Sequence, residues 1–565
     1  MRLPLALLLA ASLSAQTTAR RLNRYEYNAT IRDLLAVPFQ PAADFPADDS
    51  GYGFDNIAGV LSLSPALLER YLAAAENIAG AAIIPPTPPS PTVFHIAAAD
   101  FHFPVDFEGD YDVLISGPSD PAPFSIDGVP IDIDSNEFRI RLGPGNPRLR
   151  IDVPKLHYVE VRGPYNAVAP PLSESYRRVF RCGHAPGHHT LACARSNVAE
   201  FARRAYRRPV TNDELNGLMH FVEHADTIDR GVQLAVEAIL VSPNFLFRLE
   251  SDPLDDFQLA SRLSYFLWSS MPDDGLFALA SGHRLRDSDV LRAQIHRMLA
   301  DPKSRALADN FAGQWLETRN LASLQPDPAK FPEFTPALRR DMQQETRLFV
   351  QSIIRENRPI SDFLSANYTF LNQRLAAFYG IAGVEGARFR RIDLPADSHR
   401  GGIFTQASVL TVTSYPARTS PVLRGKWILE NLLGAPPPPP PPNVPRLEET
   451  ALPESASMRQ RLEKHRSNPA CSGCHSRMDT LGFDLENYDA IGRFRAQDGP
   501  APIDAGDGPD ALRARLLADR DRFARCLASK LATYALGRKA SVPSAHGNET
   551  FAQLVEEIMT EDAHE

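Results

Sequence analysis

Two proline-rich stretches set the strongest limit on how this chain can fold. Residues 85–91 are mostly proline, and residues 436–442 are an unbroken proline run. Proline has a fixed φ and no N–H donor, so neither stretch can lie inside a helix or a central strand. The second stretch should form a stiff polyproline II spacer. We therefore expect the 565-residue chain to fold as several units separated by linkers.

The spacing of apolar residues differs between these units. Residues 21–80 and 173–433 show helical spacing, as do the residues after the second proline stretch. Between 93 and 163 the apolar residues alternate, for example Tyr111, Val113 and Ile115. An Asp127-Gly128 pair in this segment is a hairpin-turn signal. The pattern predicts a mainly α, multi-domain helical protein with a small inserted β-sandwich.

The N-terminus has the pattern of a secretory signal. Arg2 precedes an apolar run, Leu3 to Leu13, that is too short to span a bilayer, and small residues follow it. We expect cleavage near Ala15 or Gln16, with a buried N-terminal helix as the alternative. The chain should therefore be exported to the periplasm or cell surface, without a transmembrane segment. The net charge of -9 gives no reason to expect nucleic-acid binding.

The sequence Cys471-Ser-Gly-Cys474-His475 carries the strongest chemical signal. Covalent attachment of a c-type haem needs two thiols that meet the two vinyl groups and a histidine directly after them that ligates the iron. A redox dithiol would sit in a βαβ pattern, which we do not find, and a zinc site would need a second ligand pair. We expect Cys471 and Cys474 to hold one haem c, with His475 as the proximal iron ligand.

The residue on the other side of the iron is harder to assign. His465 lies just upstream of the motif and is the leading candidate. The alternatives are His546, Met458 and Met559, or an open site. A methionine ligand would raise the reduction potential relative to a second histidine, and an open site would favour enzymatic chemistry.

Two further cysteines enclose a short loop, Cys182-Gly-His-Ala-Pro-Gly-His-His-Thr-Leu-Ala-Cys193. In an oxidising compartment we expect a Cys182–Cys193 disulfide, because glycine and proline let this loop bend. Binding of a metal by these cysteines and by His184, His188 and His189 is the alternative. Cys526 should be a buried free thiol.

Two polar segments can be interpreted either as binding sites or as ordinary polar loops. The acidic loop with Asp44, Asp48, Asp49 and Asp55 contains oxygen ligands that suit calcium, but its spacing favours a solvated loop. In residues 411–426, Arg418 and Arg424 could hold haem propionates or an anionic substrate, although an ordinary polar loop is favoured.

The chain resembles the multi-domain planctomycete-specific cytochrome-associated family, a series of adjacent domains of unknown function in secreted bacterial proteins. The resemblance rests on residues 22–35, 201–210, 259–268, 371–375, 400–427, 471–475, 481–487 and 530–538. It implies an exported, haem-bearing protein whose β insertion is carbohydrate-module-like. Many members have an additional cytochrome c domain near the N-terminus, whereas this chain has no second Cys-x-x-Cys-His.

The sequence thus predicts an ordered set of units. They are a signal peptide (1–16), an N-terminal helical domain (17–84), a β-sandwich (93–163), helical domains (173–433), a polyproline linker (434–445) and a C-terminal helical cytochrome c-like haem unit (446–565). The favoured function is electron transfer or haem-dependent redox chemistry in the cell envelope.

Two other functions remain open. The chain could be a haem-dependent oxidoreductase that acts on an extracellular polymer or metabolite, or a carbohydrate-binding surface protein with an accessory haem. The expected partners are a haem c maturation system, a redox partner protein and, for the last function, a polysaccharide.

Overall fold

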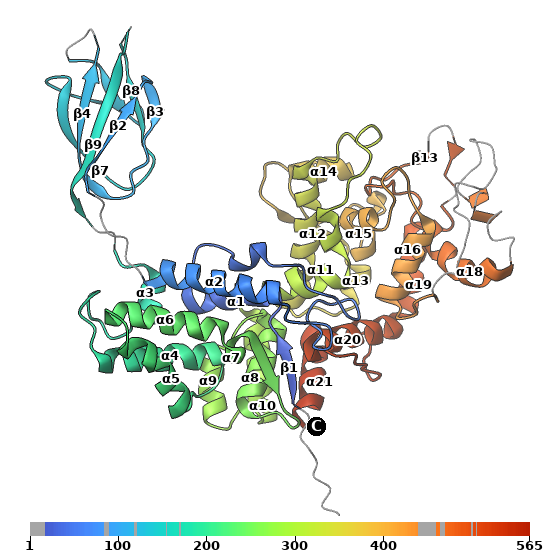
Figure 1. The fold of residues 1–565 in the computed structure, drawn as a ribbon. Helices are drawn as coiled ribbons and strands as arrows, with labels where there is room; N and C mark the ends of the chain where they lie inside the picture. Colours follow the sequence, from blue (N-terminus) through green and yellow to red (C-terminus); the bar gives the residue numbers. More distant parts are fainter. Residues whose placement is uncertain are drawn as a thin grey trace, which may run out of the picture.

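The structure is a computed structural model that describes residues 17–83, 90–117, 121–153, 155–168, 171–438, 459–460, 462–463, 469–498, 501–503 and 505–564. Helices make up 50% of it and strands 14%, and it contains several sheets (Figure 1). The expectation of a mainly α protein is therefore wrong, and the fold is a mixture of α and β. In the described part of the chain, no helix is long and apolar enough to cross a membrane. The expected signal peptide lies outside the described residues.

Part of the missed β structure consists of three pairs of short strands. Strand β1 (Thr18–Arg21) pairs antiparallel with β10 (Phe247–Glu250), and β11 (Tyr368–Leu371) pairs with β12 (Arg390–Asp393). The two-residue strands β13 (Gln497–Asp498) and β14 (Ala501–Pro502) form a third pair. Strands of two to four residues are too short to show a period of two, so no local pattern in the sequence indicates them.

The first helical unit combines segments from both sides of the β insertion. Helix α1 begins after Asn23, whose side chain accepts from the Glu26 amide while the Glu26 carboxylate accepts from the Asn23 amide. Helix α2 packs on α6 and α1 packs on α3, so residues before and after the insertion share one apolar core. The elements are α1 (Arg24–Leu35), η1 (Pro41–Asp44), α2 (Pro65–Ile83), α3 (Glu174–Val179), α4 (Leu191–Tyr206), α5 (Asn212–Glu223), α6 (Ile228–Val241) and α7 (Pro243–Leu246).

The insertion forms two four-stranded antiparallel sheets, with strand orders β2-β9-β4-β7 and β3-β8-β5-β6. Its core is separate from that of the helices and includes Val113, Leu149 and Val159. Along β4, buried and partly exposed residues alternate, as expected when one sheet face is covered. The strands are β2 (Thr92–Ile96), β3 (Asp100–His102), β4 (Glu108–Ser116), β5 (Phe124–Ile126), β6 (Val129–Ile131), β7 (Glu137–Leu142), β8 (Arg148–Ile151) and β9 (Tyr158–Val168).

The largest apolar core joins the central helices to the C-terminal ones. Helix α20 packs on α8, and α21 packs on α10, α12 and α20. The central elements are α8 (Asp256–Trp268), α9 (Asp274–Ser281), α10 (Ser288–Ala300), η2 (Pro302–Ser304), η3 (Leu307–Ala312), α11 (Gly313–Trp315), η4 (Thr318–Ala322), α12 (Pro336–Arg355), α13 (Asp362–Ser365), α14 (Gln373–Tyr379), η5 (Ala396–Ser398), η6 (Ile403–Thr405) and α15 (Ala407–Val412). The C-terminal ones are α16 (Pro421–Trp427), η7 (Ile428–Leu432), α18 (Pro469–Phe483), α19 (Gly508–Ala518), α20 (Arg520–Leu536) and α21 (Phe551–His564).

Candidate functional site

The Cys-x-x-Cys-His motif lies in the first half of α18. Positions 471, 474 and 475 are spaced i, i+3 and i+4, so they share one face of that helix. The side chains of Cys471 and Cys474 lie outside the described residues. The His475 side chain is 16% exposed, and its Nδ1 atom lies 3.1 Å from Oδ1 of Asp479, one helical turn further on. Asp479 is fully buried, so it can hold the imidazole in one orientation.

The second half of α18 is fixed by an unusually close crossing with α16. A Cβ atom at Gly425 of α16 would overlap the Met478 carbonyl, and one at Gly482 of α18 would overlap the Pro421 carbonyl. The two glycines therefore let the helix backbones touch directly. This contact sets the position of the helix that carries His475.

The loop after α18 is held by a buried arginine. Arg424 donates from Nη1 to the carbonyls of Leu485 and Tyr488, at 2.6 and 2.8 Å, and from Nη2 to that of Asp489, at 2.7 Å. Burial lowers the pKa of Arg424 to about 10. Because its guanidinium is buried on backbone carbonyls, Arg424 is structural and does not present a surface for propionates or a substrate. Arg418 lies over the Tyr415 ring, with Cζ 4.4 Å from the ring centroid.

A buried carboxyl, that of Glu345, lies among the central helices, close to β11 and α14. Glu345 on α12 is 1% exposed and accepts from Thr369 Oγ1 at 2.7 Å and from the Tyr379 hydroxyl at 2.5 Å. The Arg400 guanidinium lies 3.6 Å from the Tyr379 ring centroid. Burial raises the pKa of Glu345 to about 7, and burial followed by the Glu345 charge raises that of Tyr379 well above its ordinary value. Nothing in the sequence around Glu345 distinguished it from a surface glutamate.

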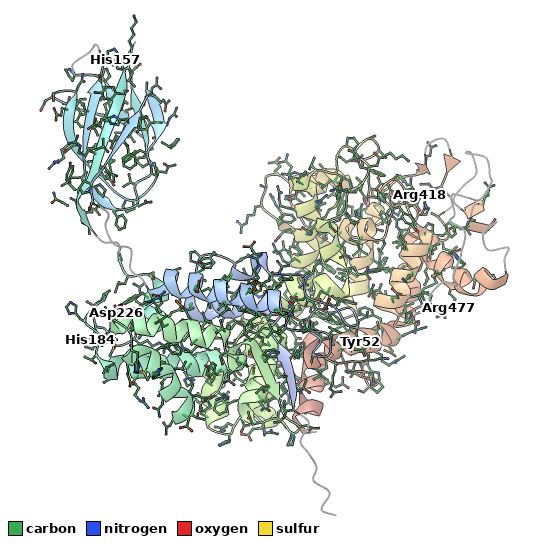
Figure 2. The ribbon with its side chains drawn as sticks, in the orientation of Figure 1. Tyr52, His157, His184, Asp226, Arg418 and Arg477 are labelled. Atoms are coloured by element: carbon green, nitrogen blue, oxygen red, sulfur yellow. A yellow bond between two sulfur atoms is a disulfide. The ribbon has the colours of Figure 1, made fainter. Side chains whose placement is uncertain are left out.

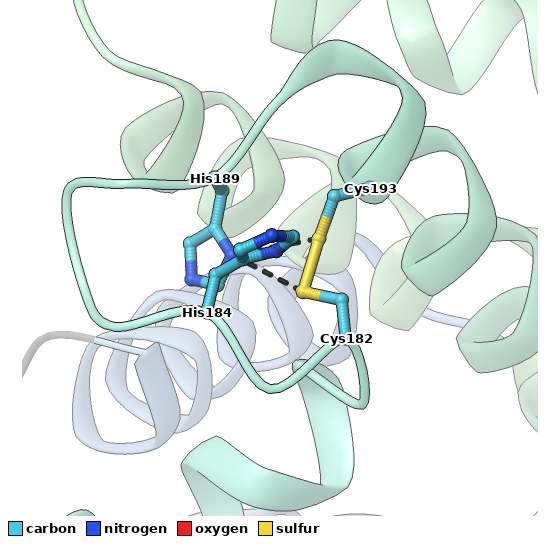
Figure 3. Close-up of side chains that lie close together, drawn as sticks. All are labelled: Cys182, His184, His189 and Cys193. Carbon is cyan, nitrogen blue, oxygen red and sulfur yellow. Dashed lines mark hydrogen bonds between the residues drawn. A yellow bond between two sulfur atoms is a disulfide. The ribbon is translucent and has the colours of Figure 1, made fainter.

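The loop between residues 182 and 193 brings two cysteines and two histidines together (Figure 3). Cys182 and Cys193 are bonded in the structure, with Cα atoms 6.2 Å apart. His189 is buried, stacks on the Phe180 ring and places Nε2 2.8 Å from the Tyr176 hydroxyl. Burial lowers the pKa of His189, which favours the neutral ring.

A cavity of about 960 Å³ lies between the N-terminal loop and helix α20. Tyr52, labelled in Figure 2, stands at its edge and is 60% exposed. Cys526 also lines it and is a buried free thiol, as the sequence predicted. The other residues that line it include Gln314, Glu317, Glu430, Asn431, Arg522, Arg525, Lys530 and Lys539. No sequence pattern indicates this cavity, because its walls come from segments that are distant along the chain.

The candidates for the sixth iron ligand are only partly visible. His465 and Met458 lie outside the described residues. Met559 is fully buried on α21, whose packing partners include α10, α12 and α20, while His546 is exposed. The assignment of His465 as the sixth ligand stays a prediction.

The acidic N-terminal loop is tied down by protein partners. Asp48 accepts from Nη2 of Arg21 and from the Arg24 amide, both at 2.7 Å. Asp55 accepts from Nδ2 of Asn23 at 2.8 Å and from Nη1 of Arg319 at 2.7 Å. These two carboxylates are therefore held by protein partners and order the loop.

The fold and the motif define a multi-domain protein of mixed α and β structure with a Cys-x-x-Cys-His sequence on one of its helices. Five sequence families match it in tandem, each described only as a protein of unknown function. They are DUF1587 at residues 20–84, DUF1595 at 193–250, DUF1592 at 254–381, DUF1588 at 400–498 and DUF1585 at 504–545. This set fits the multi-domain planctomycete cytochrome-associated families. No curated protein and no solved structure matches the chain.

Proposed function

We propose that the chain carries one haem c, joined through thioethers to Cys471 and Cys474 and bound at its iron by His475, and that it transfers electrons in the cell envelope. The observation that carries this proposal is the His475–Asp479 pair. An iron-ligating histidine commonly donates its second ring nitrogen to a carboxylate, which fixes the tautomer and orients the ring. His475 has such a partner within its own helix, 3.1 Å away.

The residues around His475 suit this role. With Nδ1–H donating to Asp479, the Nε2 atom carries the lone pair that a metal needs. The haem iron, when bound, supplies one-electron chemistry between its ferric and ferrous states. Asp479 makes the imidazole a stronger donor, and the contact between Gly425 and Met478 keeps α18 in place. The cytochrome-associated families that match the chain fit a haem-related role.

A haem-dependent oxidoreductase is the second candidate. It would need an open iron site, whereas electron transfer is favoured by a sixth ligand such as His465. An absorption spectrum separates them: a low-spin spectrum that carbon monoxide and peroxide leave unchanged supports electron transfer. A high-spin ferric spectrum that responds to both ligands supports an enzyme.

Carbohydrate binding by the β-sandwich has less support. On the outer face of the β2-β9-β4-β7 sheet, the described residues include paired charges such as Arg139 with Asp112, at 2.6 Å, and Arg141 with Glu108, at 2.9 Å. Such ion pairs occupy the face on which a sugar-binding sandwich would need exposed aromatic rings. A glycan array probed with the full chain would overturn this ranking if it showed specific binding.

The test of haem attachment is expression of the full chain with a c-type haem maturation system, followed by haem staining of a denaturing gel. We expect a stained wild-type band and the loss of stable two-bond attachment in Cys471→Ala and Cys474→Ala. Cys526→Ala, which removes a cysteine outside the motif, is the matched control and should stain normally. An unstained wild-type band would overturn the proposal. Cell fractionation of the same strains tests export, and a stained protein confined to the cytoplasm would contradict it.

A further inference from the structure

The cluster at the 182–193 loop has the composition of a metal site. Cys182, His184, His189 and Cys193 each offer one ligand atom, and these four atoms all lie within 4.8 Å of one another (Figure 3). Two sulfurs and two imidazole nitrogens are a common donor set of tetrahedral zinc sites. The cluster lies in the region matched by DUF1595 and just before it, outside the haem motif.

The distances to His189 fit such a site. Its Nδ1 atom lies 3.3 Å from the sulfur of Cys182 and 3.5 Å from that of Cys193. In a tetrahedral site with Zn–S near 2.3 Å and Zn–N near 2.1 Å, a sulfur and a nitrogen ligand are about 3.6 Å apart. His189 is therefore already placed as a ligand, while the two bonded sulfurs would have to separate to about 3.8 Å.

Neighbouring residues support the donors in the way that outer contacts support metal ligands. Nε2 of His189 meets the Tyr176 hydroxyl at 2.8 Å, which directs Nδ1 toward the sulfurs. Nδ2 of Asn197 lies 3.4 Å from the Cys182 sulfur and 3.3 Å from the Cys193 sulfur, so it can donate to both thiolates. Asp229 accepts from the Gly187 amide at 2.9 Å and so anchors the loop between the histidines.

We propose that Cys182, His184, His189 and Cys193 bind one Zn²⁺ when the Cys182–Cys193 bond is reduced. A dithiol reductant gives two electrons and two protons to the disulfide and itself becomes a disulfide. The two thiols lose their protons to solvent as the ion binds. Two thiolates, two neutral imidazoles and Zn²⁺ have no net charge, which suits a partly buried site. His184, which is exposed, gives the ion access from solvent.

The loop is therefore a redox-dependent metal site, in which the disulfide and the ion exclude each other. This inference does not depend on the proposed haem, because none of its residues belongs to the 471–475 motif.

The test uses the full chain with Cys471→Ala and Cys474→Ala, so that the haem motif cannot bind the metal. After reduction with a phosphine and removal of the reductant, the chain is titrated with Zn²⁺, and with Co²⁺ as a spectroscopic probe. We expect one Zn²⁺ per reduced chain and none per oxidised chain, with a sulfur-to-cobalt charge-transfer band. Bound Zn²⁺ should protect Cys182 and Cys193 from alkylation.

Single variants identify the ligands. His189→Ala and His184→Ala should each weaken Zn²⁺ binding at least about tenfold. His188→Ala is the matched control, because this exposed histidine of the same loop lies outside the cluster, and it should bind Zn²⁺ normally. His184 is exposed, so its variant remains informative even if His189→Ala does not fold. The proposal is overturned if the reduced chain binds no Zn²⁺, or if His184→Ala and His188→Ala bind it equally well.

Discussion

Replacing Glu345 by glutamine should change how the stability of the protein depends on pH. The folded-state pKa is about 7, against an ordinary value of 4.5. The folded protein therefore holds this proton more tightly than the unfolded chain does. The stabilisation from Glu345 is complete below about pH 4.5 and is lost as the pH rises through 7. A difference of about 2.5 pKa units corresponds to about 3 kcal/mol. Glutamine keeps the shape and can bond to the hydroxyls of Thr369 and Tyr379, but it does not titrate.

The assay is urea unfolding of both proteins at several pH values between 4.5 and 8.5. The measured quantity is the difference in unfolding free energy between Glu345→Gln and wild type at each pH, so that other titrating groups cancel. We expect the unfolding free energy of Glu345→Gln, relative to that of wild type, to rise by about 3 kcal/mol between pH 4.5 and 8. Glu223→Gln, on an exposed residue at the end of α5, is the control and should show no such trend. A difference that stays constant across the range would refute the reasoning.

Three other predictions test the helix crossing, the proximal histidine and the loop disulfide. Gly425→Ala should lower the free energy of unfolding, measured with urea, by about 1–3 kcal/mol, because the new Cβ would meet the Met478 carbonyl. Gly217→Ala is the control: open space surrounds this position on α5, and the change should raise the free energy of unfolding by about 0.5–1 kcal/mol. Equal effects of the two changes would contradict the close crossing of α16 and α18. Asp479→Asn should raise the reduction potential of the proposed haem, because a weaker imidazole donor stabilises ferric over ferrous iron less. Each tenfold change in the ratio of ferric to ferrous stability corresponds to about 59 mV. If a redox titration shows an unchanged potential, Asp479 does not act through His475. Peptide mapping without reduction should recover Cys182 and Cys193 in one linked peptide pair, and two free thiols in the untreated protein would disprove the disulfide.

The sequence was informative where the signal is local. The alternation at Tyr111, Val113 and Ile115 reflects a sheet face that is covered along the whole of β4, and the structure buries these three residues. The fold class was nevertheless wrong, in part because it left out strands such as β1 and β10, which are short and pair across more than two hundred residues, a distance that no local period can reveal.

In the candidate site too, features formed by neighbouring residues could be predicted, whereas features formed by distant segments could not. The Cys-x-x-Cys-His motif and the Cys182–Cys193 loop could be recognised in the sequence because the residues of each are close together along the chain. The roles of Glu345 and Arg424 were not predicted, since each depends on burial by segments that lie elsewhere in the chain. Arg424 in particular was considered as an anion ligand, and only the structure shows that backbone carbonyls surround its guanidinium.

The strand at the start of the described chain has a consequence for the order in which the protein can assemble. Arg20 in β1 is 2% exposed and donates from Nη1 to the Ala535 carbonyl, at 2.9 Å, and from Nη2 to the Tyr534 carbonyl, at 3.0 Å. The Ala535 and Tyr534 carbonyls are 515 and 514 residues away from Arg20 in the sequence. During synthesis from the N-terminus, the Arg20 guanidinium can form these two hydrogen bonds only after α20 has been made. A chain cut short before α20 would leave this guanidinium without two of its three backbone acceptors, because only the Asn56 carbonyl, 3.0 Å from Nε, lies outside that helix. Packing around β1 is thus completed by α20, which comes after α18 and α19 in the chain.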